Sequence, residues 1–200
     1  MAQRRGRRLR RAFYRRDPRE VAPDLLGKVL VRDGLAARIV EVEAYCGAED
    51  PGSHAYRGMT GRNATMFGPP GHLYVYFTYG MHWCANAVCG DEGEGVAVLL
   101  RAAEPLRGLD EMRVRRVKAR RDRDLLAGPA RLCQAFALTG AEDGADLVTA
   151  SHDVTIVDDG TPPPARPLVG PRIGLSVGTE HPWRWCRPES PFVSGPRPRP

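Results

Sequence analysis

Lysine is nearly absent from this chain of 200 residues, although the chain is strongly basic. Only Lys28 and Lys118 occur among the 30 lysine and arginine residues, so arginine supplies almost all of the positive charge. The net charge of +6 favours a polyanionic partner, nucleic acid before a membrane surface. The scarcity of lysine also leaves few side-chain amines that could act as nucleophiles.

Membrane spans, signal peptides and disulfide frameworks have no support in the sequence either. No apolar run approaches the length of a membrane span, and no apolar stretch follows the arginine-rich N-terminus as it would in a signal peptide. The five cysteines, at positions 46, 84, 89, 133 and 186, are odd in number and have no close-paired spacing. We therefore expect reduced, mostly buried thiols of a cytosolic protein.

No internal repeat and no shift in composition divides the chain, and its length suits one sizeable domain. Residues 1–12 are predicted to be a basic, disordered arm, residues 13–195 the folded domain, and residues 196–200 a disordered tail. Eight arginines lie within residues 1–16. They are compatible with an arm that touches phosphates and equally with a solubilising tail.

The most informative stretch is residues 38–45, RIVEVEAY, which alternates with a period of two and predicts a half-buried strand. Apolar residues on one face suit a core, whereas Glu41, Glu43 and Tyr45 share the other face. Nine residues after Tyr45, His54 lies in a loop rich in glycine, proline and serine. A carboxylate beside aromatic faces suits a pocket that binds a flat ring and carries out acid–base chemistry on it.

Secondary structure can be predicted along most of the chain. The loop at 46–71 is long for a compact domain, and such loops are usually functional. Turn and periodicity signals predict helices that begin at Asp17-Pro18, at Pro105 and at Gly128-Pro129 and end near Gly27, Arg121 and Gly140. Strands are predicted at 28–32 and 35–45, joined by an Asp33-Gly34 hairpin turn, and at 73–78, 82–89, 96–101, 154–157, 172–177 and 183–193.

Six blocks of the sequence occur together in a characteristic order. They are RIVEVEAYCGAED (38–50), His54, Arg62-Asn63 with Met66-Phe67, PGHLYVYFTYGMHWCAN (70–86), VLLRAAEP (98–105) and GPARL (128–132). In order and spacing these blocks resemble the alkyladenine, or 3-methyladenine, DNA glycosylase family, from about residue 13 to residue 195. Residues 185–188 (WCRP) depart from the family, which has a more apolar strand there.

The resemblance implies a fold and a reaction. The fold is α+β, a single domain with a largely antiparallel, curved β-sheet, flanking helices and a protruding β-hairpin. The reaction is that of a DNA glycosylase of base excision repair, which flips an alkylated or deaminated purine out of duplex DNA and hydrolyses its N-glycosidic bond. Glu43 is then the general base that activates water, and Arg101 orients Glu43 and that water. Neither lysine belongs to this group of residues, so we expect a monofunctional hydrolase that leaves an abasic site.

By the same resemblance, Tyr45, His54 and Tyr76 surround the extruded base, Asn86 lies at the pocket floor, and Tyr79 fills the vacated stack. The residues alone leave plainer roles open. His54 suits a local hydrogen bond in a loop, Tyr76 or Tyr74 a place in the core, Tyr79 a strand end, Asn86 a bond to backbone, and Arg101 a phosphate or solvent contact. Glu41 is expected to be structural.

Contacts with the DNA backbone are predicted for Arg62, Met81 and Arg131, the last because it stands near a helix N-terminus, which favours anions. Further arginines of the arm and of residues 113–123 are candidates for phosphate contacts. We expect a monomer that binds double-stranded DNA with damaged purines and no membrane. Its expected location is the cytoplasm, at the nucleoid, in a bacterium, or the nucleus in a eukaryote.

No cofactor and no metal are predicted. His72, His82, Cys84 and Cys89 lack the spacing of zinc ligands. Two other classes of protein remain as alternatives: a nucleic-acid binding module without activity, for which Glu43 in a basic groove would be unfavourable, and a metal-dependent nuclease, for which Glu43, Glu49 and Asp50 are the candidate ligands.

Overall fold

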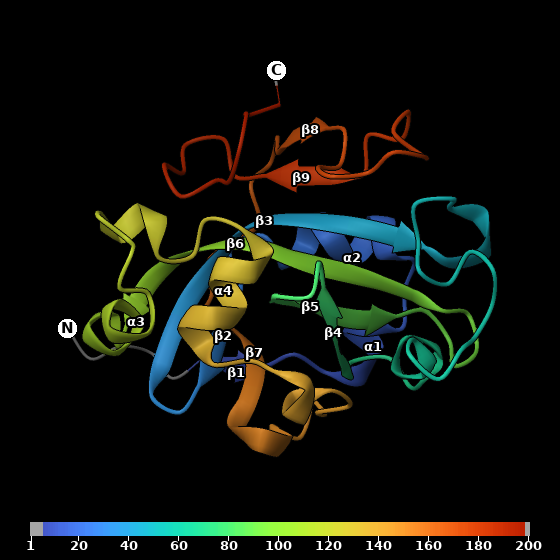
Figure 1. Cartoon of the computed structure of the whole chain (residues 1–200), viewed down its shortest axis with the longest axis horizontal. Coiled ribbons are helices and arrows are strands. Elements are labelled where there is room, and N and C mark those ends of the chain that lie inside the picture. Colours follow the sequence, from blue (N-terminus) through green and yellow to red (C-terminus); the bar gives the residue numbers. More distant parts are fainter. Residues whose placement is uncertain (1–5, 199–200) are drawn as a thin grey trace.

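A curved antiparallel sheet organises the chain, of which a computed structural model describes residues 6–198 (Figure 1). Its main path runs in the order β1-β7-β2-β3-β6-β5-β4, and each of its pairs is antiparallel. The two longest strands, β3 (Leu35–Cys46) and β6 (Val96–Arg107), lie at its centre and pair along most of their length. The predicted α+β fold with a largely antiparallel, curved sheet is confirmed.

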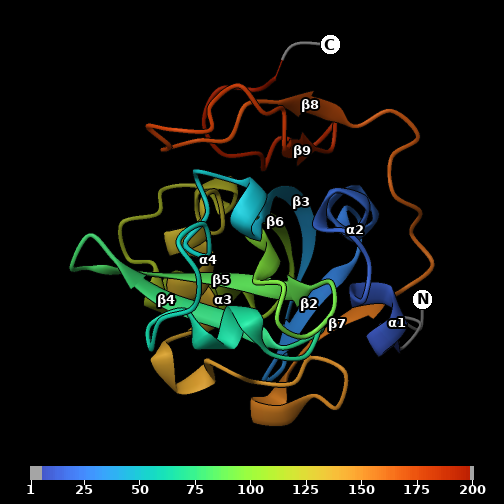
Figure 2. The ribbon, with the colours of Figure 1, turned by 90° about the vertical axis from the view of Figure 1, so that its right-hand side faces the viewer.

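The shorter elements surround this central pair. The other strands are β1 (Arg7–Arg8), β2 (Val29–Arg32), β4 (Leu73–Thr78), β5 (His82–Cys89), β7 (Val154–Asp158), β8 (Leu168–Gly170) and β9 (Arg184–Cys186). The α-helices are α1 (Arg11–Tyr14), α2 (Pro18–Leu25), α3 (Leu109–Arg115) and α4 (Pro129–Phe136). Single 3₁₀ turns occur at Gly47–Glu49, Ala64–Phe67, Asp122–Asp124, Gly140–Glu142 and Ser151–Asp153. The β4–β5 hairpin projects from the body (Figure 2).

The two faces of the sheet have different roles. One face carries the main core, into which α2 and α4 bury apolar residues such as Leu25 and Phe136. The opposite face, covered by the long loop at 46–71, holds a smaller cluster around Met66 and Tyr74, with Tyr45 packed beside it. Because side chains alternate along a strand, Glu41 and Glu43 share this second face with Tyr45. The loop therefore covers the polar residues of β3.

Local sequence signals explain several boundaries. Asp17 caps α2 by accepting a hydrogen bond from the Arg19 backbone N–H, and Pro18 occupies the first turn, where its missing N–H costs nothing. Asp33 and Gly34 both have positive φ, 45° and 81°, which suits a two-residue hairpin turn that matches the twist of β2 and β3. The predicted start of α2 and the predicted β2–β3 hairpin are confirmed.

The helix predicted at residues 105–121 is wrong over most of its length. β6 continues as far as Arg107 because it stays paired with β3, and α3 covers only Leu109–Arg115. Pro105 is tolerated within β6 because the register of the pair shifts beside it, between Ala36 and Ala37. Pairing between residues distant in sequence has here outweighed the local helix signal.

The C-terminal strands were also predicted too long. Residues 172–177 form a loop, only Arg184–Cys186 of the second segment forms a strand, β9, and β8 was not predicted. β9 pairs with the second half of β3 at Glu41, Val42 and Glu43. The helix that begins at Pro129 ends at Phe136, before the predicted stop at Gly140, because Ala137 adopts a left-handed conformation with φ of 53°.

Both predicted disordered termini are partly wrong. β1 pairs with β7, Leu9 is buried in the core, and Arg11 forms an ion pair with Asp146, so residues 7–12 belong to the fold. At the other end, the Pro196 carbonyl accepts a hydrogen bond from Arg184. The remainder of each prediction, residues 1–5 and 199–200, lies outside the described residues.

The cysteines and helices agree with the composition. All five cysteines are buried free thiols, as predicted. Within residues 6–198, no helix has both the length and the apolar character required to cross a membrane.

Candidate active site

Glu43 is a fully buried carboxylate with three hydrogen-bond donors around it. The Ile173 backbone N–H donates to its Oε1 at 2.7 Å, and the Tyr45 hydroxyl and Arg101 Nη1 donate to its Oε2 at 3.1 Å and 3.2 Å. Tyr45 comes from the same strand, Arg101 from the neighbouring strand β6, and Ile173 from the loop after β8. Three separate segments therefore fix the orientation of this one side chain.

A pair of irregularities in the β3–β6 register brings Arg101 to this position. Ile39 pairs with Ala103, Glu41 with Ala102 and Val42 with Leu100, so the register shifts once on each strand and Arg101 has no partner in the ladder. Bulges of this kind often lie beside active sites, where they redirect a side chain. Arg101 donates through Nε to Glu41 at 2.9 Å and through Nη1 to Glu43.

Glu41 is the structural counterpart of Glu43. It is fully buried and accepts hydrogen bonds from Arg101 Nε, from Arg184 Nε at 2.8 Å and from the Ser194 backbone N–H at 2.6 Å. The two carboxylates and the two guanidinium groups balance each other in charge. All contacts of Glu41 are to protein groups, which agrees with the structural role expected from the sequence.

Burial raises the pKa of Glu43 above that of an ordinary glutamate, because the charged form loses its hydration. The Arg101 cation, the Ile173 N–H and the Tyr45 hydroxyl lower it, and the neighbouring Glu41 charge raises it. For Arg101, burial works against the charged form, but the two carboxylates prevail and raise its pKa. Perturbed groups of this kind are concentrated in functional sites.

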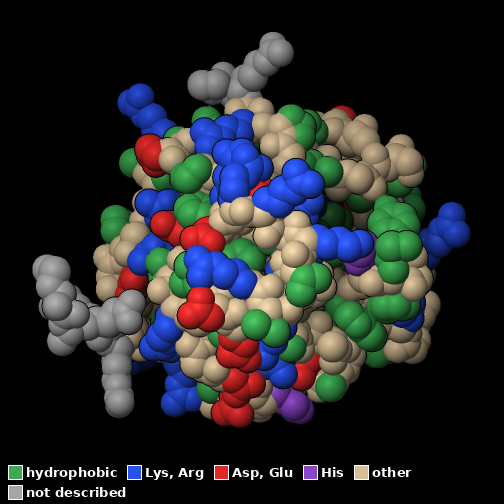
Figure 3. Space-filling view, turned by 60° about the vertical axis from the view of Figure 1, so that its left-hand side comes forward, with side chains coloured by type: hydrophobic (Ala, Val, Ile, Leu, Met, Phe, Trp, Pro, Cys, Tyr) green, Lys and Arg blue, Asp and Glu red, His purple; other side chains and the backbone are tan. Residues whose placement is uncertain are grey.

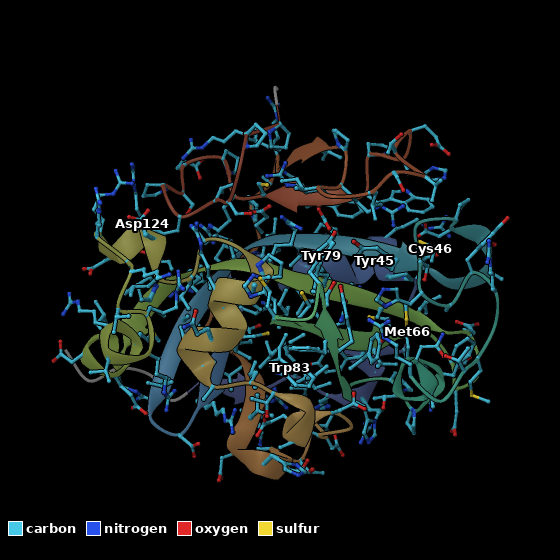
Figure 4. All side chains as sticks on the ribbon, in the orientation of Figure 1. Tyr45, Cys46, Met66, Tyr79, Trp83 and Asp124 are labelled. Atoms are coloured by element: carbon cyan, nitrogen blue, oxygen red, sulfur yellow. The ribbon has the colours of Figure 1, made fainter. Side chains whose placement is uncertain are left out.

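A cavity of about 300 Å³ opens directly above this group. Glu43 itself does not line it, but its three donors, Tyr45, Arg101 and Ile173, all do. The other walls are mainly aromatic and apolar side chains, among them His54, Met66, Tyr74, Tyr76, Tyr79, Cys84, Asn86 and Leu175. The volume lies at the small end of the range for ligand pockets, about 300–1,000 Å³. Tyr45, Met66 and Tyr79 are labelled around it in Figure 4.

His54, Tyr74 and Tyr76 form one wall through mutual contacts. His54 Nδ1 lies 3.2 Å from the Tyr74 hydroxyl, and its ring meets the edge of Tyr76 at a centroid distance of 4.5 Å. The two tyrosine rings stack at 5.4 Å. Burial, followed by the nearby Arg62 charge, lowers the pKa of His54, so its imidazole is neutral at pH 7. The loop histidine thus makes a local hydrogen bond and also faces the cavity.

Asn86 is buried on β5 and lines the cavity. Its Nδ2 donates to the Tyr74 carbonyl at 3.1 Å, which fixes the orientation of the amide. The bond to backbone that the sequence left open is therefore present, and it leaves the carbonyl oxygen of Asn86 for the cavity.

Tyr79 stands at the tip of the β4–β5 hairpin with 81 % of its surface exposed, so it is not a core residue at a strand end. Its φ of 51° is unusual for a bulky side chain, and strained backbone of this kind is common at functional sites. Met81, 68 % exposed, flanks it. The hairpin presents two large apolar side chains to solvent beside the mouth of the cavity.

The other predicted DNA contacts lie at the surface. Arg62 is exposed and donates to the Phe77 carbonyl at 2.6 Å, which ties the loop to the hairpin. Arg131 is exposed in the first turn of α4, and Pro129 of the same turn lines the cavity. The structure therefore places Arg62, Met81 and Arg131 around the cavity, although nothing in it tests their contact with DNA.

The basic segment at residues 113–123 is less positive than its sequence indicates. Arg113 pairs with Asp110 and Asp122, Arg115 with Glu111, and Arg121 with Asp124. In the view of Figure 3, lysine and arginine side chains gather toward the top, and acidic side chains lie mostly lower down. The candidate phosphate contacts in this segment are thus reduced to its remaining cations.

Several cavity residues were missed from the sequence. Tyr74 and Cys84 share strand faces with Tyr76 and Asn86, so period-two alternation could have identified them. Ile173 acts through its backbone N–H, for which the side chain gives no signal. The loop residues Gly174 and Leu175 come from the stretch that was predicted to be a strand.

The candidate nuclease carboxylates do not converge. Asp50 is buried and paired with Arg172, Glu49 is exposed, and Glu43 makes neither contact. Among residues 6–198 there is no group of three His, Cys, Asp or Glu side chains that could hold a metal ion.

A buried carboxylate with fixed donors beneath an aromatic-walled cavity fits the class of enzymes that bind a flat ring and move a proton. Comparison with known proteins identifies the family. The profile described as "Methylpurine-DNA glycosylase (MPG)" matches residues 12–191. A protein of Burkholderia lata is 62 % identical over 189 residues, covering 94 % of this chain and 91 % of its own length. A Streptomyces avermitilis protein is 53 % identical over 192 residues, covering 93 % and 90 %.

Both relatives carry the provisional name 3-methyladenine DNA glycosylase. The chain belongs to the methylpurine-DNA glycosylase family, which confirms the resemblance seen in its sequence blocks. It is therefore a hydrolase of N-glycosyl bonds in DNA, of a family that repairs alkylation damage.

Proposed function

We propose that the chain is a monofunctional glycosylase that flips alkylated or deaminated purines out of duplex DNA and releases them with a water activated by Glu43. The observation that carries this proposal is the cavity of about 300 Å³ whose walls include all three hydrogen-bond donors to Glu43. A base extruded into it would stack on Tyr45 on one side and meet His54 and Tyr76 on the other. The sugar carbon under attack would then lie near the carboxylate.

Glu43 takes a proton from the water as it attacks the anomeric carbon of deoxyribose, while the bond to the purine nitrogen breaks. Arg101 orients the carboxylate by donating to Oε2 and leaves Oε1 to the Ile173 N–H. An alkylated purine carries a positive charge and leaves as a neutral base, so the aromatic walls add a cation–π preference for damaged bases. Asn86, fixed by its bond to Tyr74, disfavours the exocyclic amine of ordinary guanine at the pocket floor.

Neither lysine is placed to form a Schiff base with the sugar. Lys28 pairs with Asp158 at 2.8 Å on the β2–β7 side of the sheet, and Lys118 follows α3. Neither lines the cavity. The product should therefore be an intact strand with an abasic site, because strand cleavage through an imine requires an amine. We propose that the enzyme acts as a monomer on double-stranded DNA and, given its bacterial relatives, at the nucleoid.

The direct test is a base-release assay on duplexes that carry one lesion each: 3-methyladenine, 7-methylguanine, ethenoadenine or hypoxanthine. Release of at least one of these bases, without a strand break until alkali is added, is the expected result. A protein that binds such duplexes but releases none would instead be a binding module. Strand cleavage of undamaged DNA would favour a nuclease.

Excision should proceed at an unchanged rate in excess EDTA, because the proposed attack uses only water, Glu43 and Arg101. The measurement is the single-turnover rate on a lesion duplex with EDTA and with added Mg²⁺. A rate that depends on the divalent ion would contradict the proposed chemistry.

Replacing Tyr79 with alanine should weaken capture of the flipped lesion about 5- to 100-fold, because the stack vacated by the base would lose an aromatic partner worth roughly 1–3 kcal/mol. The measurement is the affinity for lesion duplex relative to undamaged duplex. Val117→Ala is the matched control, because Val117 is equally exposed, at 81 %, but lies outside the cavity. Equal losses for both duplexes with Tyr79→Ala would assign Tyr79 to general DNA binding.

A further inference from the structure

Arg172 and Asp50 form a fully buried ion pair beside the candidate active site. Arg172 Nη1 lies 2.5 Å from Asp50 Oδ2, and Nη2 lies 2.7 Å from Oδ1, so the pair is bidentate. The same two nitrogens donate to the Ala44 carbonyl at 3.0 Å and to the Gly178 carbonyl at 3.1 Å. Asp50 accepts in addition from the Cys46 and Gly52 backbone N–H groups. One ion pair thus joins the end of β3, the turn after it and the loop at 172–178.

The guanidinium of Arg172 also supports a wall of the cavity. Its central carbon lies 4.7 Å from the centre of the Tyr45 ring and 5.1 Å from that of Trp183. Tyr45 lines the cavity, whereas Arg172 and Trp183 do not, so the cation is packed against Tyr45 away from the cavity. Planar guanidinium groups stack on aromatic rings in a way that an ammonium group does not reproduce.

The next residue along the chain carries the contact to Glu43. The Ile173 N–H donates to Glu43 Oε1 at 2.7 Å, the shortest of the three bonds to that carboxylate. Because Arg172 also holds the Gly178 carbonyl, it closes the loop at 172–178 on itself. Ile173 and Leu175 of this loop line the cavity. The position of the N–H therefore depends on the grip of Arg172 on β3 and Asp50.

We propose that Arg172, held by Asp50, is a positioning residue: it keeps the Ile173 N–H on Glu43 and the Tyr45 ring in the plane of the cavity wall. Its relevance to catalysis rests on the proposed role of Glu43 as the general base. Two buried charges offer little net stability over apolar residues of similar volume, because both must be removed from water. A fork that binds three segments at once gives geometric precision instead.

The N–H is one of several influences on Glu43. The titratable groups near it are Glu41 and Tyr45 on β3, Tyr76 on β4, Cys84 on β5, Arg101 on β6, Cys186 on β9 and Arg172 itself. A variant that keeps the charge at position 172 leaves this set unchanged. Any change in the titration of Glu43 then reports on the position of the N–H.

Arg172→Lys is such a variant, because lysine keeps a cation opposite Asp50 but cannot span Asp50, Ala44 and Gly178 with a planar fork. A hydrogen bond to the ionised form lowers a carboxyl pKa, so loss of the Ile173 donor should raise that of Glu43. We expect an increase of about one pH unit, from the usual strength of a hydrogen bond to a charged group. The readout is carbon-13 NMR titration of the glutamate carboxyls in the free protein, with the Glu43 signal assigned by its absence in Glu43→Gln.

The pH–rate profile supplies a second readout on 7-methylguanine duplex, whose leaving base already carries its charge. Its acid limb should move to higher pH by the same amount, a tenfold lower rate per unit on the acid side. If wild-type protein releases no base, the proposed function fails, but the carboxyl titration still decides whether Arg172 positions the N–H.

Arg32→Lys is the matched control. Arg32 is largely buried and paired with Glu142, and it holds the Phe136 and Ala137 carbonyls, but it contacts no cavity residue. An unchanged Glu43 pKa in folded Arg172→Lys, or an equal shift in Arg32→Lys, would overturn the inference. If Arg172→Lys does not fold, Asp50→Glu, which keeps the ion pair but changes its length, decides by the same titration.

Discussion

Replacing Glu43 with glutamine should lower the single-turnover rate of base excision at least about 100-fold while lesion binding persists, because a positioned general base contributes about 10²–10⁴-fold. Glutamine has the shape of glutamate and can still accept the Ile173 N–H, but its amide cannot take a proton from water at neutral pH. Arg101 keeps its bond to Glu41. The fold should therefore survive with little change in stability.

The measurement is excision at saturating enzyme, with lesion affinity and thermal unfolding recorded on the same preparation. A variant that keeps a tenth of the wild-type rate would rule out Glu43 as the general base. A variant that loses binding as well as excision would show that glutamine disturbs the cavity, and the rate would then say nothing about proton transfer.

The raised pKa of Glu43 gives the sign of the pH dependence. The ionised carboxylate is the active form, so excision of a cationic lesion should fall as the pH drops through the pKa of Glu43. Because burial raises that pKa, the acid limb should lie above pH 4.5, the value for an ordinary glutamate. In Glu43→Gln this limb should disappear from the residual activity.

The amino-acid sequence contained much of this site, because period-two alternation on β3 places Glu41, Glu43 and Tyr45 on one face whatever the rest of the chain does. The hairpin boundaries and the start of α2 follow equally from local signals, such as Asp33-Gly34 and Asp17-Pro18. Long-range contacts decided the rest. β6 runs through Pro105 only because β3 pairs with it, and the segment at 172–177 is a loop held by Arg172 and Asp50.

The division of labour between the two glutamates was less accessible from the sequence. Glu41 and Glu43 differ in partners that come from distant segments: Arg184 and the Ser194 N–H for one, and Tyr45 and the Ile173 N–H for the other. Arg101 reaches both because of the bulge, which no local signal indicates. A single substitution at each position separates the two roles.

Replacing Glu41 with glutamine should lower the free energy of unfolding by about 3–5 kcal/mol, because removal of one partner from a buried ion-pair group leaves uncompensated charge. Arg101 and Arg184 would both lose their bond to a carboxylate at this position, and only Glu43 would remain to balance two buried cations. The Ser194 N–H would keep an acceptor. The cost therefore comes from charge rather than from lost packing.

Urea denaturation of Glu41→Gln beside Glu43→Gln and Glu111→Gln gives the measurement and its controls. Glu111 forms an exposed ion pair with Arg115 one helical turn away, and such pairs contribute less than about 1 kcal/mol. The expected order of destabilisation is therefore Glu41→Gln well above the other two, while excision is lost first in Glu43→Gln. A Glu41→Gln protein as stable as wild type would show that the two arginines find other partners, and that Glu41 does not hold this part of the fold together.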